Sequence, residues 1–168
     1  MKSDQVDHIL AQWRRARPDV DVSPMGVVFR IKRLARVLDR ATTRNFAGHG
    51  LEPGEFDVLS TLRRTGPPHR VSAGELGRAL MITSGSVTNR VDGLEARELI
   101  RRADDPDDRR GVLIELTAKG LRLVDAALEN HVETERQLLA GLTAPQQSQL
   151  ADLLRRLLIA LGDDPSAR

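Results

Sequence analysis

Residues 71–117 decide the fold; they read VSAGELGRAL MITSGSVTNR VDGLEARELI RRADDPDDRR GVLIELT. Ser72 and Glu75 have the spacing of a capping box, which predicts that a helix begins at this point. Thr83 is a favourable N-cap residue and predicts the start of a second helix after a short turn. The stretch therefore begins as a helix, a tight turn and another helix.

The second of these helices has an apolar stripe and a small, polar outer face. Val87, Val91 and Leu94 recur at helical spacing and predict the buried stripe. The residues on the opposite side include Gly85, Asn89 and Asp92. Such a face suits a helix that approaches base edges and phosphates, and it also fits an ordinary solvated surface.

Two short strand-like runs, 99–103 and 112–116, flank a polar tip with Pro106 and predict a β-hairpin. Two helices followed by a hairpin make a winged helix-turn-helix, whose second helix enters the DNA major groove. An arginine at the wing tip can enter a narrow minor groove. We expect Arg110 to do so, with Arg109 as the alternative. The same charge run also fits a plain solvated loop.

The polar side of the helix-turn-helix supplies the other expected contacts with double-stranded DNA. Hydroxyl and amide groups form hydrogen bonds with phosphate oxygens and base edges. The expected DNA contacts are Ser72, Thr83, Ser84, Ser86, Thr88, Asn89, Arg109 and Arg110. Binding should weaken steeply with salt, because each phosphate contact releases counterions.

Composition narrows the class of protein. Apolar residues make up 40% of the 168 residues, enough for a core, but aromatic residues only 2%, so the core must be mainly aliphatic. No run is long enough to span a membrane, and the N-terminus lacks the apolar segment of a signal peptide, so we expect a cytoplasmic protein. The absence of cysteine excludes disulfides and thiol-based redox sensing.

The basic residues are almost all arginine, since only three of the 26 lysine and arginine residues are lysines: Lys2, Lys32 and Lys119. Arginine forms planar, bidentate contacts with phosphate and guanine. A general arginine bias of the source explains the same composition equally well. The net charge of +2 is weak support for nucleic-acid binding by itself.

Amphipathic helices flank the central stretch. The apolar spacing predicts helices over 6–17, 25–49, 53–64, from Thr117 to about Ala140, and after a capping box of Thr143 with Gln146. The predicted organisation is an extra N-terminal helix and linker (1–24), a helical dimerisation region (25–50 and 118–161), a winged helix-turn-helix (51–117) and a flexible tail (162–168). The predicted fold class is mainly α with a small β-wing.

Four segments resemble the multiple antibiotic resistance regulator (MarR) family: 51–59, 75–77, 87–95 and 107–117. The Asp-Arg-Arg of the wing, followed by a strand that ends in Leu-Thr, is the most specific of them. The resemblance extends from about Met25 to Leu161. The resemblance implies a dimeric winged-helix transcription regulator. Members of the family are mostly repressors, and many are released from DNA by small ligands.

The last predicted helix has a broad leucine face that either covers the chain's own core or pairs with a second copy. The face consists of Leu150, Leu153, Leu154, Leu157, Leu158 and Leu161. The resemblance implies pairing, because terminal helices of the family interlock into a homodimer. A two-fold dimer reads two half-sites about 34 Å apart, so we expect a pseudo-palindromic operator.

Trp13, Asp57, Arg64 and Arg90 resemble the pocket of the urate-responsive branch of the family, which also has an extra N-terminal helix. The resemblance implies a small anionic aromatic ligand such as urate, which needs a stacking ring, guanidinium groups and an acceptor. A ligand that pulls on Arg90 would re-aim the second helix. Three other roles remain open: a surface pair of Asp57 with Arg64, a phosphate contact by Arg90, and simple packing by Trp13.

The residues do not predict an enzyme, a cofactor or a metal site. The four histidines, His8, His49, His69 and His131, lack metal-ligand spacing. The sequence has no glycine-rich phosphate loop and no nucleophile elbow. The alternatives to a ligand-responsive regulator are a constitutive DNA-binding regulator and a winged helix that binds another protein. The operator, the regulated genes and the sign of regulation cannot be read from the sequence.

Overall fold

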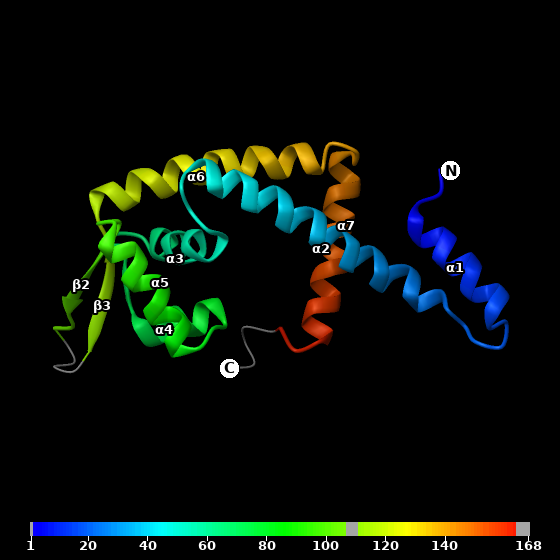
Figure 1. The fold of residues 1–168 in the computed structure, drawn as a ribbon, viewed down its shortest axis with the longest axis horizontal. Coiled ribbons are helices and arrows are strands. Elements are labelled where there is room, and N and C mark those ends of the chain that lie inside the picture. Colours follow the sequence, from blue (N-terminus) through cyan, green and yellow to red (C-terminus); the bar gives the residue numbers. More distant parts are fainter. Residues whose placement is uncertain (1, 107–110, 164–168) are drawn as a thin grey trace.

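The computed structural model describes residues 2–106 and 111–163, and these residues form seven helices and three strands (Figure 1). In chain order the elements are α1 (Gln5–Ala16), α2 (Ser23–Gly48), α3 (Pro53–Arg64), β1 (Arg70–Ser72), α4 (Ala73–Leu80), α5 (Ser84–Ala96), β2 (Ile100–Asp104), β3 (Val112–Leu116), α6 (Ala118–Leu138) and α7 (Ala144–Ala160). In Figure 1, α3, α4, α5 and the sheet form a lobe at one end of the molecule, and α1 lies at the other end. The long helix α2 runs from the lobe toward α1, and α6 runs from the lobe to the start of α7. The predicted class, mainly α with a small β-wing, is confirmed.

The helix caps that the sequence predicts are present. Ser72 and Glu75 form the capping box of α4, and Thr83 accepts a hydrogen bond from the backbone N–H of Ser86 at the start of α5. Thr117 caps α6 in the same way, and Thr143 forms a capping box with Gln146 at the start of α7. Each cap satisfies backbone N–H groups that have no partner within the helix.

The sheet differs from the sequence prediction in two respects. Strand β1 was not predicted, because three residues are too few to show an alternating pattern; it pairs antiparallel with β3, with Val71 opposite Ile114. Strand β2 begins at Ile100 rather than Leu99. The backbone N–H of Leu99 donates to Leu94 and its carbonyl accepts from Thr117, so it is outside the ladder. The strand order is β1-β3-β2.

Two helix boundaries differ from prediction by two residues, and the other differences are of one residue. Helix α2 begins at Ser23, so Pro24 belongs to its first turn and not to the preceding linker. Proline fits there because the first N–H groups of a helix have no intrahelical partner. Helix α6 ends at Leu138, slightly before the predicted Ala140.

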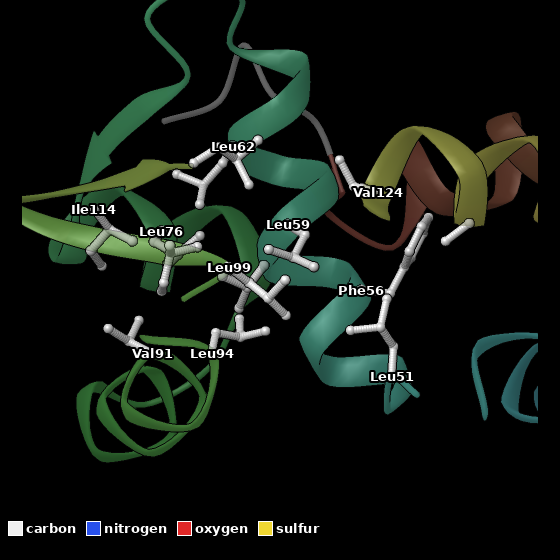
Figure 2. Packing of buried hydrophobic residues seen from close by; sticks show 14 of the residues in the cluster. Leu51, Phe56, Leu59, Leu62, Leu76, Val91, Leu94, Leu99, Ile114 and Val124 are labelled. Atoms are coloured by element: carbon white, nitrogen blue, oxygen red, sulfur yellow. The ribbon is translucent and has the colours of Figure 1, made fainter. Parts of the chain in front are cut away.

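One continuous core joins the winged lobe to the long helices. Leu59 and Leu62 of α3 are fully buried at its centre, and Figure 2 shows Leu76, Leu94 and other side chains from the lobe around them. The core extends to α6 through Val124 and Ala127 and to α2 through Phe46. Helix α5 is therefore anchored to the same apolar cluster that carries the long helices.

A second, smaller cluster attaches α1 to the start of α2. Val6, Leu10 and Val22 are buried in it, next to Met25 and Phe29. Arg30 of α2 adds ion pairs of 2.8 Å to both Asp4 and Asp7, which also form the capping box of α1. The extra N-terminal helix is thus held on α2 by apolar packing and by charge.

A large apolar surface is uncovered in the single chain. Helix α7 has no buried residue, although its exposed side chains include Leu153, Leu154, Leu157, Leu158 and Ile159. Helix α2 also exposes apolar side chains in its first half and just beyond it, namely Val27, Val28, Ile31, Leu34, Val37 and Leu38. No helix in the described part of the chain has the length and apolarity needed to span a membrane.

Candidate nucleic-acid interface

Helix α5 turns its polar side outward from the lobe. Val87, Val91 and Leu94 are buried beneath it, as the sequence predicts, and this fixes which face is exposed. Ser84, Thr88 and Asn89 are exposed on the outer side, and Ser86 is half-buried. The Thr88 hydroxyl donates to the Ser84 carbonyl at 3.1 Å. The outer face of α5 therefore presents hydroxyl and amide groups together.

The other two hydroxyl candidates lie at helix starts. The Ser72 Oγ accepts from the Glu75 N–H at 3.2 Å and donates to the Glu75 carboxylate at 2.8 Å. The Thr83 Oγ1 is 3.0 Å from the Ser86 Oγ and caps α5. Both side chains thus have structural partners besides any contact with DNA. The hydrogen bonds from Ser72 lower the pKa of Glu75, which keeps this carboxylate charged.

The wing follows α5 directly. Arg101 of β2 forms a 2.9 Å ion pair with Glu115 of β3 across the hairpin. The Asp105 N–H donates to the Gly111 carbonyl at 3.2 Å near the tip. Arg109 and Arg110, the predicted minor-groove residues, lie outside the described residues, so their role stays a prediction.

Arg102 connects the wing to α5, the helix expected to enter the major groove and called the recognition-type helix below. Its Nη2 lies 2.5 Å from the Asp92 carboxylate, and its side chain also pairs with Glu95. The Arg102 backbone N–H donates to Glu95 at 3.0 Å, which adds a second link between β2 and α5. The hydrogen bond that Arg102 donates to Asp92 raises the pKa of Arg102, so the arginine remains charged. This connection was not predicted from the sequence.

The inner side of α5 contacts the first turn of α3. The Arg90 Nη1 donates to the Gly54 carbonyl at 3.4 Å. At the end of α5, the Arg97 Nη1 donates to both Glu55 oxygens at 3.0 Å, and its Nη2 donates to the Gly50 carbonyl at 2.7 Å. Two arginines therefore tie the recognition-type helix to one turn of α3.

Asp57 lies beside these contacts, and its side chain is exposed to solvent. Partial desolvation of the carboxylate raises its pKa, since it disfavours the charged form, while the positive charges of Arg90 and Arg64 act in the opposite direction. Arg64 and Arg90 are thus both close enough to act on the charge of Asp57, and the ligand-binding role of these residues stays a prediction. No ion pair joins Asp57 to Arg64 among the described residues; the Arg64 Nη2 donates instead to the Thr61 hydroxyl at 3.0 Å.

His131 of α6 belongs to the same region and was not singled out from the sequence. Its ring lies against Phe46 and Phe56, with ring centroids 5.1 and 5.4 Å apart. Its Nε2 is 3.2 Å from the Glu135 carboxylate, and its Nδ1 is buried without a hydrogen-bond partner in the described structure. His131 is seven residues after Val124, so helical spacing could have placed it on the buried side of α6.

Residues 49–111 match the MarR family. The chain is also 40% identical over 153 residues to the HTH-type transcriptional regulator PecS of Dickeya dadantii (strain 3937), and the match covers 91% of this chain and 92% of PecS. This chain belongs to the MarR family. It is therefore a transcription regulator built on the winged-helix DNA-binding fold, and not an enzyme.

Two further comparisons place this MarR-family chain among its relatives. It is 29% identical to the HTH-type transcriptional repressor NicR of Pseudomonas putida over 143 residues, which cover 83% of this chain and 89% of NicR. Its fold matches the crystal structure of Sco3205, a MarR family regulator from Streptomyces coelicolor in complex with DNA, with a TM-score of 0.76 and 27% identity. That match covers 88% of this chain and 96% of Sco3205.

Trp13, the fourth residue of the predicted ligand pocket, lies far from the other three within one chain of this MarR-family protein. It lies on α1, which packs on the start of α2, and 44% of it is exposed. In Figure 1, α1 is at the opposite end of the long axis from α3 and α5, which carry Asp57, Arg64 and Arg90.

Proposed function

We propose that this MarR-family regulator is a repressor that binds a pseudo-palindromic operator as a homodimer and leaves it when a small anionic aromatic molecule, such as urate, is bound. The observation that carries the DNA-binding part is the exposed hydroxyl and amide face of α5 beside the wing. Two relatives support it: NicR is a transcriptional repressor, and Sco3205 was solved in complex with DNA.

The uncovered apolar surfaces support the homodimer. A helix such as α7, with exposed leucines and no buried residue, gains little from folding in a single chain. Exposed apolar surface of this extent marks a protein interface in a folded domain. A second copy that packs on α7 and on the first half of α2 would bury both surfaces and would present two α5 helices to two half-sites.

The charges around Asp57 support an anionic ligand. Two guanidinium groups, Arg64 and Arg90, act on the single carboxylate of Asp57, so this region attracts an anion that also offers an N–H group to Asp57. Trp13 would then come from the second copy, because its own α1 lies at the far end of the chain. An anion that draws Arg90 toward itself would shift α5 on the DNA.

Fluorescence anisotropy tests this proposal directly. Purified protein is titrated onto labelled DNA from just upstream of its own gene, with urate and salicylate added in separate series. We expect nanomolar, salt-sensitive binding that urate reverses. Arg64→Ala should weaken release by urate much more than it weakens DNA binding, whereas Ser148→Ala, on the exposed polar side of α7, should change neither.

Each other outcome assigns a different function. Binding that neither anion reverses would remove the ligand from the proposal and leave a constitutive regulator. Absence of salt-sensitive binding to that DNA and to random duplex DNA would contradict the DNA-binding role and favour a winged helix that binds a protein.

A further inference from the structure

The first turn of α3 holds α5 at two points that differ in strength. The contact at the end of α5 joins Arg97 to Glu55 and Gly50. The contact in the middle joins Arg90 to Gly54. A helix held at two unequal points is released first at the weaker one and turns about the stronger one.

The contact of Arg97 is the stronger one. Its guanidinium forms two 3.0 Å hydrogen bonds with Glu55 and one of 2.7 Å with the Gly50 carbonyl. The Glu55 side chain is only 17% exposed and is fixed further by a 3.0 Å hydrogen bond from the Glu52 N–H. Lys119 donates to the Arg97 carbonyl at 2.9 Å, so α6 supports the same point. Hydrogen bonds between charged groups are stronger than those between neutral groups, and this contact has two of them.

The contact of Arg90 is weak and depends on the absence of a side chain at Gly54. Its single hydrogen bond is 3.4 Å long and has a neutral acceptor. A Cβ atom on Gly54 would lie 2.6 Å from the Arg90 Cζ and 2.8 Å from its Nε. Gly54 is the second residue of α3, where its backbone is helical and would accept any residue. A side chain at this position would therefore displace the guanidinium of Arg90 and leave the backbone unstrained.

We propose that Gly54 is a positioning residue for the recognition-type helix. It leaves room for Arg90 to form a weak contact that a ligand can break, here called the latch. The strong contact of Arg97 with Glu55 stays in place and is the hinge about which the helix turns. This inference rests on the proposed function, since it states how an anion near Arg90 would move α5. Ser84 is thirteen residues from Arg97, which is about 20 Å along the helix. A turn of about 10° at the hinge moves Ser84 by about 3 Å, the length of a hydrogen bond.

Gly54→Ala tests the latch without removing any charge. Alanine favours a helix more than glycine does, so the melting temperature should stay the same or rise. The displaced Arg90 should nevertheless weaken DNA binding by roughly tenfold. Urate should have less effect on the variant than on the wild type, because the latch is already open. Gly48→Ala, at the end of α2 with no atom near the added Cβ, is the matched control and should behave as the wild type.

A double-mutant cycle distinguishes the latch from a general effect of Gly54. In an Arg90→Ala background, Gly54→Ala should change DNA affinity no further, because its effect acts through the Arg90 side chain. The proposal would be overturned if Gly54→Ala lowered DNA affinity equally in both backgrounds. It would also be overturned if the single variant Gly54→Ala bound DNA and responded to urate as the wild type does.

Amide hydrogen exchange gives a readout that needs neither DNA nor ligand. Gly54→Ala and Arg90→Ala should each speed exchange over residues 84–91 by roughly threefold or more and leave residues 94–97 unchanged. A uniform change along α5, or none, contradicts the latch even if DNA is bound and urate acts. If the exchange pattern is as expected but urate does not release the protein from DNA, the latch stands and only the ligand is rejected.

Discussion

The guanidinium of Arg102 on β2 lies 2.5 Å from the carboxylate of Asp92 on α5, and this ion pair joins the wing to the recognition-type helix. Asp92 is exposed near the surface that would meet DNA, where a free carboxylate would repel phosphate. Arg102→Gln should therefore weaken DNA binding by roughly three- to tenfold at low salt, with a smaller loss at high salt because salt screens exposed charges. Anisotropy titrations at two salt concentrations measure both effects.

Asp92→Asn in the Arg102→Gln background is the matching control. It removes the unpaired carboxylate, so most of the lost affinity should return. If the affinity stayed low, Arg102 would act by a direct contact with DNA, and the explanation through Asp92 would be wrong.

Arg110→Ala should weaken operator binding and flatten its dependence on salt. A guanidinium in the minor groove displaces counterions, and its loss should reduce the slope of log K against log salt concentration by about one. The measurement is a series of binding constants between low and moderate salt. Arg136→Ala on α6, which pairs with Glu133 away from the lobe, should leave the slope unchanged. An unchanged slope in Arg110→Ala would reassign the wing contact to Arg109 or remove it.

The pair of helices α4 and α5 could be predicted because its signals are local. Ser72 and Glu75 are three residues apart, and Thr83 caps the helix that begins at the next residue. The contact of Arg90 with Gly54 could not be predicted in the same way. Its partners are 36 residues apart in the sequence, and a glycine near a helix start looks only like a weak helix former.

The resemblance to the urate-responsive branch predicted a ligand site with Asp57, Arg64 and Arg90. In the structure Arg64 and Arg90 both act on the charge of Asp57, and the ligand itself stays a prediction. His131 was missed, since packing of α6 against α2 and α3 brings it to the phenylalanines. The position of Trp13 relative to that site depends on a second chain, and the pattern of one sequence does not specify how two copies pack.

Asp57→Asn should change the dependence of stability on pH. Partial desolvation raises the pKa of Asp57 above its ordinary value of 3.8, so the native state binds this proton more tightly than the unfolded state does. The stability that the protonated group contributes is complete below pH 3.8 and is lost as the pH rises through the higher, native-state pKa. The variant should thus melt at the same temperature as the wild type in acid and roughly 1–3 °C higher at pH 7, a small difference because the side chain of Asp57 is exposed to solvent.

Asp4→Asn provides a control of opposite sign. The hydrogen bond from Arg30 lowers the pKa of Asp4, so this carboxylate stabilises the native state at neutral pH and loses that effect in acid. The Asp4 variant should melt below the wild type at pH 7 and converge with it as the pH falls. A melting temperature of Asp57→Asn below that of the wild type at pH 7 would show that the charged carboxylate is stabilising, contrary to this account.

Leu157→Asp on α7 should convert the proposed dimer to a monomer. The carboxylate would lie in the middle of the apolar face that a second copy would cover, and burial of an unpaired charge is costly. Light scattering after size-exclusion chromatography measures the mass in solution. Ser148→Asp lies nine residues earlier, on the opposite side of the helix, and should remain dimeric. A wild-type protein with the mass of one chain would contradict the dimer.

Gly120→Ala should destabilise the whole fold, in contrast to Gly54→Ala. A Cβ atom on Gly120 would lie 1.9 Å from the Leu99 carbonyl oxygen, and this oxygen belongs to backbone that also bonds to Thr117. A flexible arginine can move away from a new methyl group, but the backbone between α5 and β2 cannot move without disturbing the buried Leu99 and Ile100. We expect a loss of about 2–4 kcal/mol in the free energy of unfolding, visible as a melting temperature lower by roughly 5–15 °C. Gly141→Ala, which has no atom near the added Cβ, should melt within about 2 °C of the wild type, and an equal loss in both variants would show that the close approach at Leu99 is not the cause.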